Sequence, residues 1–202
     1  MQYFNNLPKV YGSDYQGNAI VLTNLLTRIN VIPSLLTNPL LFYQYVIRDG
    51  ETPEIIAQNY YGTVDEFWLV LFSAQLMDPL WDWPLNSQQL EAYIVDKYGS
   101  LSTAQSQIDH YEQKITITNS QGSNTNIQII VVDQSTYQNN ITGSFYTATL
   151  PSGATVTTKN EYYPVYSYDN EITMNEAKRT INLIDKRYTN TIENQFKQLM
   201  SL

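Results

Sequence analysis

The sequence predicts an α+β protein, built from a small strand–helix–helix unit with extensions on either side. Turn and capping residues mark out the unit over residues 45–84. Farther on, within 111–168, apolar and polar residues alternate at 114–118, which is typical of half-buried strands. We therefore expect four parts: an extended N-terminal arm (1–43), the compact unit (44–100), a β-hairpin-rich insertion (101–168), and a C-terminal strand and amphipathic helix (169–202).

The arm mixes turn and helix signals. Residues 1–8 form a short aromatic lead, and residues 19–29 fit either a short helix or a strand. Pro33 and Pro39 then interrupt regular structure. Because the arm has little capacity to bury its own apolar residues, we expect it to lie on a partner or on the following unit.

The unit opens with a strand at Tyr45-Val46-Ile47 and a turn at Asp49-Gly50. Thr52 is placed as the N-cap of the first helix and Pro53 as its first residue, where no N–H is needed. Gly62 is the expected stop of this helix. Its predicted buried face consists of Ile55, Ile56, Ala57 and Tyr60.

The second helix of the unit begins near Thr63 or Asp65 and is apolar nearly all round, so we expect it to be buried on more than one side. We expect Asp78-Pro79 to end it and residues 81–84 to continue as an extended segment. Ser87 then caps a third helix over 88–98, which Gly99 terminates. The apolar residues of the second helix include Phe67, Trp68, Leu71 and Phe72.

Two hairpins are predicted in the insertion. One pairs residues 114–118 with 127–132 across a polar turn at 119–126, and the other pairs 145–150 with 155–159. In the C-terminal segment, residues 180–184 alternate like a strand, and the apolar residues that follow recur at helical spacing. A continuous helix from Glu176 is the competing interpretation, and we favour strand then helix.

The charge and composition of the chain argue against several classes of function. The formal net charge is −8, so no basic patch is available to neutralise phosphates or anionic lipids. No apolar run reaches transmembrane length and no signal-peptide pattern is present, so we expect neither a membrane span nor secretion. The absence of Cys fits a reducing cytoplasm and excludes thiolate metal sites. Seventeen Tyr residues suit either small β-rich cores or protein interfaces.

Candidate catalytic residues are few. His110 is the only His, and no turn is present that would expose a nucleophilic Ser, so we expect a solvated surface His. Turn and cap roles explain the acidic clusters near Asp49 and Asp78 more simply than a glycosidase pair or a calcium loop. The aromatic residues around Trp68 and Trp83 fit a sugar-stacking platform or burial against protein, and we favour burial.

Residues 45–62 resemble a LysM module, a βααβ unit often used to bind N-acetylglucosamine polymers. The residues that match are Tyr45-Val46-Ile47, Gly50-Glu51-Thr52, Ile56-Ala57 and Tyr61-Gly62. Together with its surroundings, this stretch resembles the LysM-like baseplate wedge protein of contractile-tailed phages, called wedge protein fifty-three in T4-type phages. The resemblance covers 1–100 and 168–202, through residues 1–8, 22–28, 49–53, 67–68, 78–79, 82–85 and 175–179, with Ile181, Leu183 and Ile184.

The resemblance implies a non-enzymatic virion subunit of the tail baseplate, assembled in the host cytoplasm, with no cofactor and no metal. It implies six copies in a sixfold assembly that clamp neighbouring wedges and contact the wedge core proteins and the lysozyme-like sheath-initiator subunit. We expect contacts with neither nucleic acid nor membrane. The alternatives are a peptidoglycan-binding LysM protein and a metal- or His-dependent hydrolase.

The expected interface residues fall into three groups. The docking module supplies Asp49, Gly50, Glu51, Thr52, Pro53, Tyr61, Gly62 and Trp68. The segment that closes it supplies Trp81, Asp82, Trp83 and Pro84. Ile181, Leu183, Ile192 and Phe196 are expected to anchor the C-terminal segment on the wedge core. Because neither terminal arm is expected to bury its own apolar face, both should become ordered on assembly.

Overall fold

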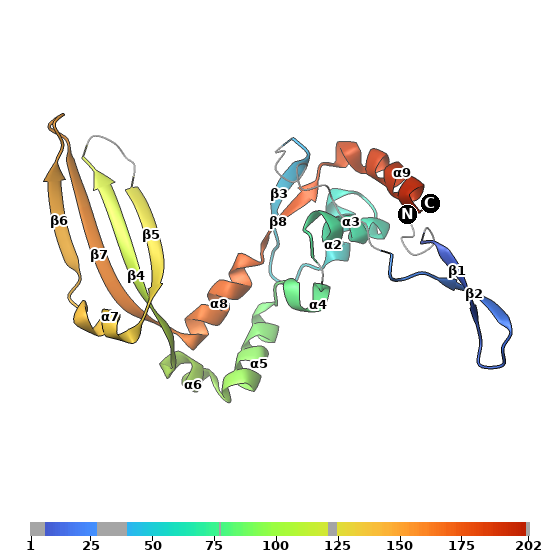
Figure 1. Ribbon diagram of the computed structural model, residues 1–202, viewed down its shortest axis with the longest axis horizontal. Coiled ribbons are helices and arrows are strands. Elements are labelled where there is room, and N and C mark those ends of the chain that lie inside the picture. Colours follow the sequence, from blue (N-terminus) through green and yellow to red (C-terminus); the bar gives the residue numbers. More distant parts are fainter. Residues whose placement is uncertain (1–6, 28–39, 77, 121–124, 201–202) are drawn as a thin grey trace. The chain divides into compact units, whose positions relative to one another are not determined.

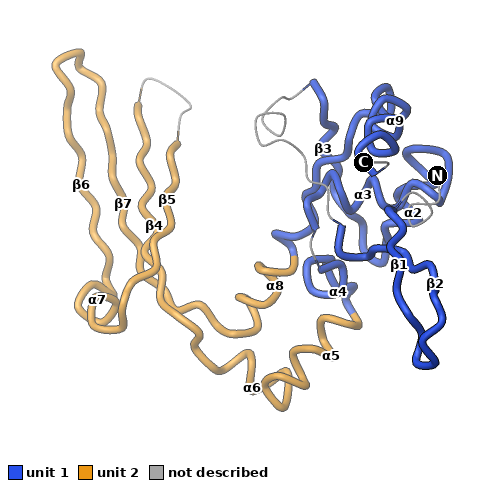
Figure 2. The backbone as a smooth tube through the Cα atoms, turned by 45° about the vertical axis from the view of Figure 1, so that its right-hand side comes forward, with its two compact units in different colours: residues 1–87, 176–202 blue, residues 88–175 orange. Residues whose placement is uncertain are grey.

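The computed structural model describes residues 7–27, 40–76, 78–120 and 125–200, and it contains both helices and strands (Figure 1). The predicted α+β class is confirmed. The chain divides into two compact units (Figure 2), which are described separately below. Unit 1 comprises residues 1–87 and 176–202, and unit 2 comprises residues 88–175.

Unit 1 begins with an antiparallel hairpin of β1 (Lys9–Ser13) and β2 (Ala19–Thr23). Its turn is held by Asp14, whose carboxylate accepts hydrogen bonds from Gln16 and Asn18. Residues 19–23 therefore form a strand, which decides between the two interpretations of this stretch. Residues 1–6 of the predicted aromatic lead, together with Pro33 and Pro39, lie outside the described residues.

The predicted strand–helix–helix unit is present as β3 (Phe42–Val46), α2 (Pro53–Tyr60) and α3 (Phe67–Ser73). A short 3-10 helix, η2 (Val64–Glu66), precedes α3. Thr52 caps α2 by accepting a hydrogen bond from the Ile55 N–H, and Pro53 occupies the first turn, as predicted. Gly62 follows α2 with φ of +91°, a conformation that suits Gly because it has no Cβ.

Two details of the unit differ from the prediction. The second helix ends at Ser73, and Asp78-Pro79 opens a further short helix, α4 (Pro79–Asp82), with Asp78 as its N-cap. Trp81 is therefore helical, and the extended backbone begins only at Trp83. The Asp-Pro pair misled because Pro suits a helix start as well as a helix end. Ile55, predicted to be buried, is 45% exposed.

The fourth element of the unit comes from the far end of the chain. β8 (Thr180–Ile184) pairs antiparallel with β3, so that β3, α2, α3 and β8 form a βααβ arrangement, with α4 and unit 2 inserted between α3 and β8. A short 3-10 helix, η3 (Lys186–Tyr188), and α9 (Thr189–Met200) complete unit 1. Strand then helix is thus confirmed, and a continuous helix from Glu176 is wrong.

Helix α3 lies between two apolar clusters, which confirms that this helix is buried on more than one side. Trp68 and Leu69 pack with residues of α9, whereas Val70 packs with residues of α2 and β8. The buried members of the first cluster are Leu7, Trp68, Leu69, Ile184, Phe196 and Met200. Those of the second are Ile47, Ile56, Ala57, Val70, Ile181 and Leu183.

Unit 2 contains a four-stranded antiparallel sheet in the order β5-β4-β7-β6, with helices before, within and after it (Figure 1). Both predicted hairpins are confirmed, and pairing of β4 with β7 joins them into one sheet. Residues 121–124 of the predicted polar turn lie outside the described residues. The strands are β4 (Ile108–Asn119), β5 (Thr125–Val132), β6 (Ser144–Thr149) and β7 (Thr155–Tyr166). The helices are α5 (Ser87–Tyr98), α6 (Leu101–Ser106), α7 (Gln134–Asn139) and α8 (Ser167–Ala177).

Candidate protein-interaction surfaces

The turn at residues 49–53 is held by hydrogen bonds from the preceding residues 45–48 and from Trp83. The Glu51 carboxylate accepts from the Tyr45 hydroxyl at 2.9 Å and from the Arg48 N–H at 2.8 Å. The Trp83 indole donates to the Glu51 carbonyl at 2.9 Å. Gly50 supplies the positive φ, +76°, that closes the turn. These contacts make the turn a rigid feature of unit 1.

Asp49 connects the turn to the two segments that flank unit 2 in the sequence. Its carboxylate accepts hydrogen bonds from the Ser87 hydroxyl at 2.9 Å and from the Arg179 guanidinium at 3.2 Å. The Ser87 hydroxyl, followed by Arg179, holds the pKa of Asp49 below its usual range. Arg179 also pairs with Glu176 at 2.7 Å. The chain leaves unit 1 and returns to it beside this turn.

The predicted docking residues Tyr61 and Trp68 lie inside unit 1. The Tyr61 hydroxyl donates to the Ile184 carbonyl at 2.9 Å, and burial raises the pKa of Tyr61. Trp68 is 4% exposed, and its ring lies 4.9 Å from that of Phe196. These aromatic side chains therefore hold α2, α3, β8 and α9 together.

The predicted C-terminal anchors belong to the same core. Ile181, Leu183 and Phe196 are buried, and Ile192 packs against the first cluster. The expectation that the C-terminal segment cannot bury its own apolar face is wrong, because β8 and α9 bury theirs against β3 and α3. That these four side chains also contact a partner stays a prediction.

The predicted closing segment is exposed at one end and buried at the other. Pro84 is buried and Trp83 is half-buried, whereas Trp81 is 69% exposed beside Leu80 on α4. Asp82 accepts a hydrogen bond from the Asp78 N–H, which closes this short helix. Of the predicted interface residues on this segment, Trp81 offers the large apolar surface to solvent.

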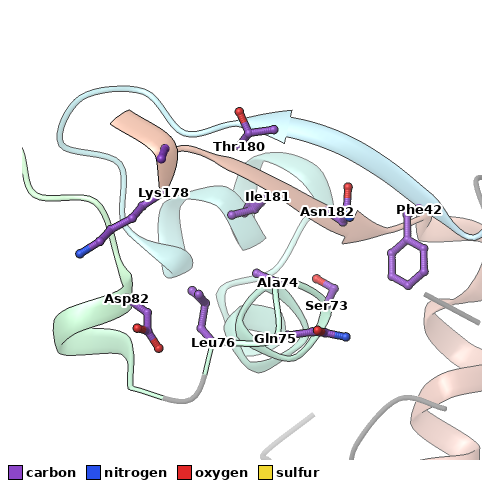
Figure 3. A pocket seen from close by; sticks show the side chains of 11 residues that line it. Phe42, Ser73, Ala74, Gln75, Leu76, Asp82, Lys178, Thr180, Ile181 and Asn182 are labelled. Carbon is purple, nitrogen blue, oxygen red and sulfur yellow. The ribbon is translucent and has the colours of Figure 1, made fainter. Parts of the chain in front are cut away.

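A cavity of about 510 Å³ lies beside α4, between the end of α3 and β8 (Figure 3). Asp82 and Lys178 line one side of the cavity. Gln75, which follows α3 and has φ of +57°, also lines it. The Lys178 ammonium donates to the Trp81 carbonyl at 2.5 Å, which ties α4 to the residues just before β8. The lining is mixed, with Phe42, Ala74, Leu76 and Ile181 as apolar members.

The β1–β2 hairpin carries apolar side chains on both faces. Val10 and Leu22 are paired on one face, and Tyr11 and Val21 on the other. Tyr11 is 86% exposed and Val21 is 62% exposed, and Leu25 and Leu26 just beyond β2 are also exposed. An isolated two-stranded hairpin is only marginally stable in water, so burial of these side chains would stabilise it. In the sequence, this hairpin is indicated by apolar runs on both sides of a turn at Asp14 and Gly17.

His110 lies on β4 between two carboxylates. Its Nδ1 is 2.8 Å from Asp109 and its Nε2 is 3.2 Å from Glu112. The hydrogen bond to Asp109 is the main cause that raises the pKa of His110. Contrary to the expectation of a fully solvated surface residue, the side chain is 23% exposed. The two carboxylates stabilise the charged imidazolium of His110, so the three side chains form ion pairs within the sheet.

The described residues offer no group of three or more His, Asp or Glu side chains placed to hold a metal ion. Among the helices in the described part of the chain, none is long and apolar enough to cross a membrane.

Exposed apolar side chains on a hairpin and on a short helix, beside a small well-packed core, are typical of structural subunits that complete their packing against other proteins. The comparisons agree with this class. The family model for base plate wedge protein 53 matches residues 11–199. The chain therefore belongs to this family of phage baseplate wedge proteins, which is not known as a family of enzymes. It is a structural protein of the virion tail baseplate that assembles with other baseplate proteins. No curated protein matches the chain.

Proposed function

We propose that this subunit clamps neighbouring wedges of the baseplate through protein–protein contacts, in six copies around a sixfold ring. The supporting observation is the β1–β2 hairpin, whose apolar side chains are exposed on both faces. A hairpin of this kind gains most when it is covered from two sides, as it would be between two proteins. Family membership supplies the assembly in which such partners exist.

We further propose that β3, α2, α3 and β8 form a LysM-like module used for protein contact. Its helices and strands follow in βααβ order, and its turn at residues 49–53 is rigid. The exposed pair Leu80 and Trp81 on α4 adds an apolar surface close to this turn, since Trp83 bonds to Glu51. The wedge core proteins and the lysozyme-like sheath-initiator subunit are the proposed partners.

The hairpin can be tested in a phage that lacks this gene and is supplied with variants from a plasmid. We expect Tyr11→Thr/Val21→Thr, which keeps residues that favour strands but removes apolar area, to leave the circular dichroism spectrum unchanged. In sedimentation, wedges should then accumulate singly and rings should be lost. The matched control is Ser13→Thr/Ala19→Thr on the same face of the hairpin, which should give normal rings.

Rings that form normally with the Tyr11→Thr/Val21→Thr variant would contradict the proposed clamp. Purified tails without this polypeptide would contradict the baseplate role altogether. Saturable binding of the purified chain to peptidoglycan, abolished by changes in the 49–53 turn, would instead favour the glycan-binding alternative.

A further inference from the structure

Strand β5 is an unprotected edge of the sheet in unit 2. It pairs with β4 on one side, and within the described residues no other strand pairs with it. Alternate residues of such a strand direct their N–H and C=O groups outward, ready to pair with a further strand. Its eight residues, TNIQIIVV, contain no charge, no Pro and no Gly. Protein edges usually carry such residues to prevent pairing, so β5 lacks the usual protection.

Apolar side chains are exposed on both faces of β5. Ile127, Ile129 and Val131 share one face, and Ile130 lies on the other. These four side chains are between 46% and 66% exposed. A strand added at this edge would therefore find apolar cross-strand neighbours on both faces, which is the main source of sheet stability.

The apolar area of this edge, summed over its two faces, is too small to hold a partner by itself. Four side chains at these exposures offer on the order of 400 Å² of apolar surface, the size of the largest patch on a typical monomer. A stable complex buries about 800 Å² on each partner, so pairing at the edge alone would be too small for a dimer. The edge suits a strand that is one part of a larger interface.

The charge of unit 2 argues against a second copy of the chain as the occupant. Residues 88–175 carry three Lys and eight Asp or Glu residues and no Arg, so two copies would repel each other. Asp133 directly follows β5, and Glu112 is the cross-strand partner of Val131. An incoming strand with apolar residues at its centre and Lys or Arg at its end would match both the uncharged edge and the net negative charge of residues 88–175.

We propose that the β5 edge accepts an extended, β-branched strand with flanking basic residues from another protein of the baseplate, which adds to the sheet as a fifth strand. This inference rests on the proposed structural role of the chain. It assigns unit 2 a contact separate from the hairpin of unit 1.

The test is photo-crosslinking in assembled particles, with p-benzoylphenylalanine in place of Ile129. We expect a crosslink to a strand of a different virion protein, located by mass spectrometry of the joined peptides. The same group in place of Glu91, exposed on α5 and away from the edges of the sheet, is the control and should give no such product. A crosslink to a second copy of this chain would overturn the proposal.

A charge variant gives an independent measurement. Ile127→Lys/Val131→Lys puts two positive charges on β5 and removes two apolar cross-strand pairs, so the crosslink from position 129 should fall about tenfold. Thr147→Lys/Thr149→Lys adds the same charge on β6 and should leave the yield unchanged. Particles that contain the chain but give no crosslink, or an equal yield from both variants, would overturn the inference. Particles without the chain would instead contradict the proposed function.

Discussion

The core of unit 1 around α3 buries large apolar side chains in two clusters, whereas most of those on the edge strands of unit 2 face solvent. In unit 1, Leu69 and Leu183 are fully buried. In unit 2, β6 is exposed along its whole length and β5 along all but its last residue. Packing therefore contributes more to the core of unit 1 than to the edge strands of unit 2. The edge strands of unit 2 therefore depend more on partners for burial than the core of unit 1 does.

The largest expected effect contrasts one buried and one exposed apolar residue. Leu183→Ala removes a fully buried side chain from β8 and should lower the free energy of unfolding by about 2–5 kcal/mol. Ile129→Ala on β5 removes a side chain that is 56% exposed and should cost at most about 1 kcal/mol. Urea denaturation of the two variants measures both. An equal loss of unfolding free energy in the two variants would show that the core of unit 1 and the edge strand β5 are equally well packed.

A smaller effect should come from the carboxyl of Glu66, which is buried in unit 1. Burial, followed by the hydrogen bond with Glu193, raises the pKa of Glu66 to about 7. The folded state therefore holds this proton more tightly than the unfolded state, whose reference pKa is 4.5. Its contribution to stability is complete below pH 4.5 and is lost as the pH rises through 7.

Glu66→Gln should accordingly stabilise the chain above pH 7 and change little at pH 4. Linkage sets a ceiling of about 3 kcal/mol for this gain, and hydration of the pair reduces the expected value to about 1 kcal/mol. Thermal unfolding at the two pH values measures it, with exposed Asp65→Asn as the matched control. A gain that is the same at both pH values would show that ionisation of Glu66 is not its cause.

The smallest expected effect concerns the only His, in the sheet of unit 2. The Asp109 hydrogen bond raises the pKa of His110 above 6.5, so the stability from its ion pairs is present below pH 6.5 and is lost as the pH rises through the folded pKa. NMR titration of the single imidazole should give a value above 6.5 that Asp109→Asn lowers. Glu91→Gln on α5 should leave the titration unchanged, and an unperturbed value in the wild-type chain would refute the assignment.

The sequence predicted the elements whose signals are local. Thr52, Pro53 and Gly62 bound α2 because capping and turn chemistry depend on a few adjacent residues. α8 was missed because its sequence, SYDNEITMNEA, lacks a clear apolar face. The pairing of β3 with β8 could not be predicted, because many strands could satisfy the same alternation and the two lie far apart in the chain.

Because this strand pairing could not be predicted, the burial of several expected interface residues within unit 1 could not be predicted either. Ile181 and Leu183 were expected to anchor a partner because an isolated C-terminal strand has nowhere to bury them. Once β8 pairs with β3, both side chains enter the core of unit 1. The hairpin surfaces around Tyr11 and Val21 escaped the residue-level prediction because the stretch fitted helix and strand equally.

The position of β8 also has a consequence for biosynthesis. The ribosome finishes residues 88–175 before it makes β8 and α9, so the middle of the chain can fold while its beginning still waits for the last strand. During that interval α3 has neither the partner strand nor α9 to cover it. A nascent chain stalled before residue 180 would therefore present this apolar helix to chaperones, and release of the finished polypeptide would end that exposure.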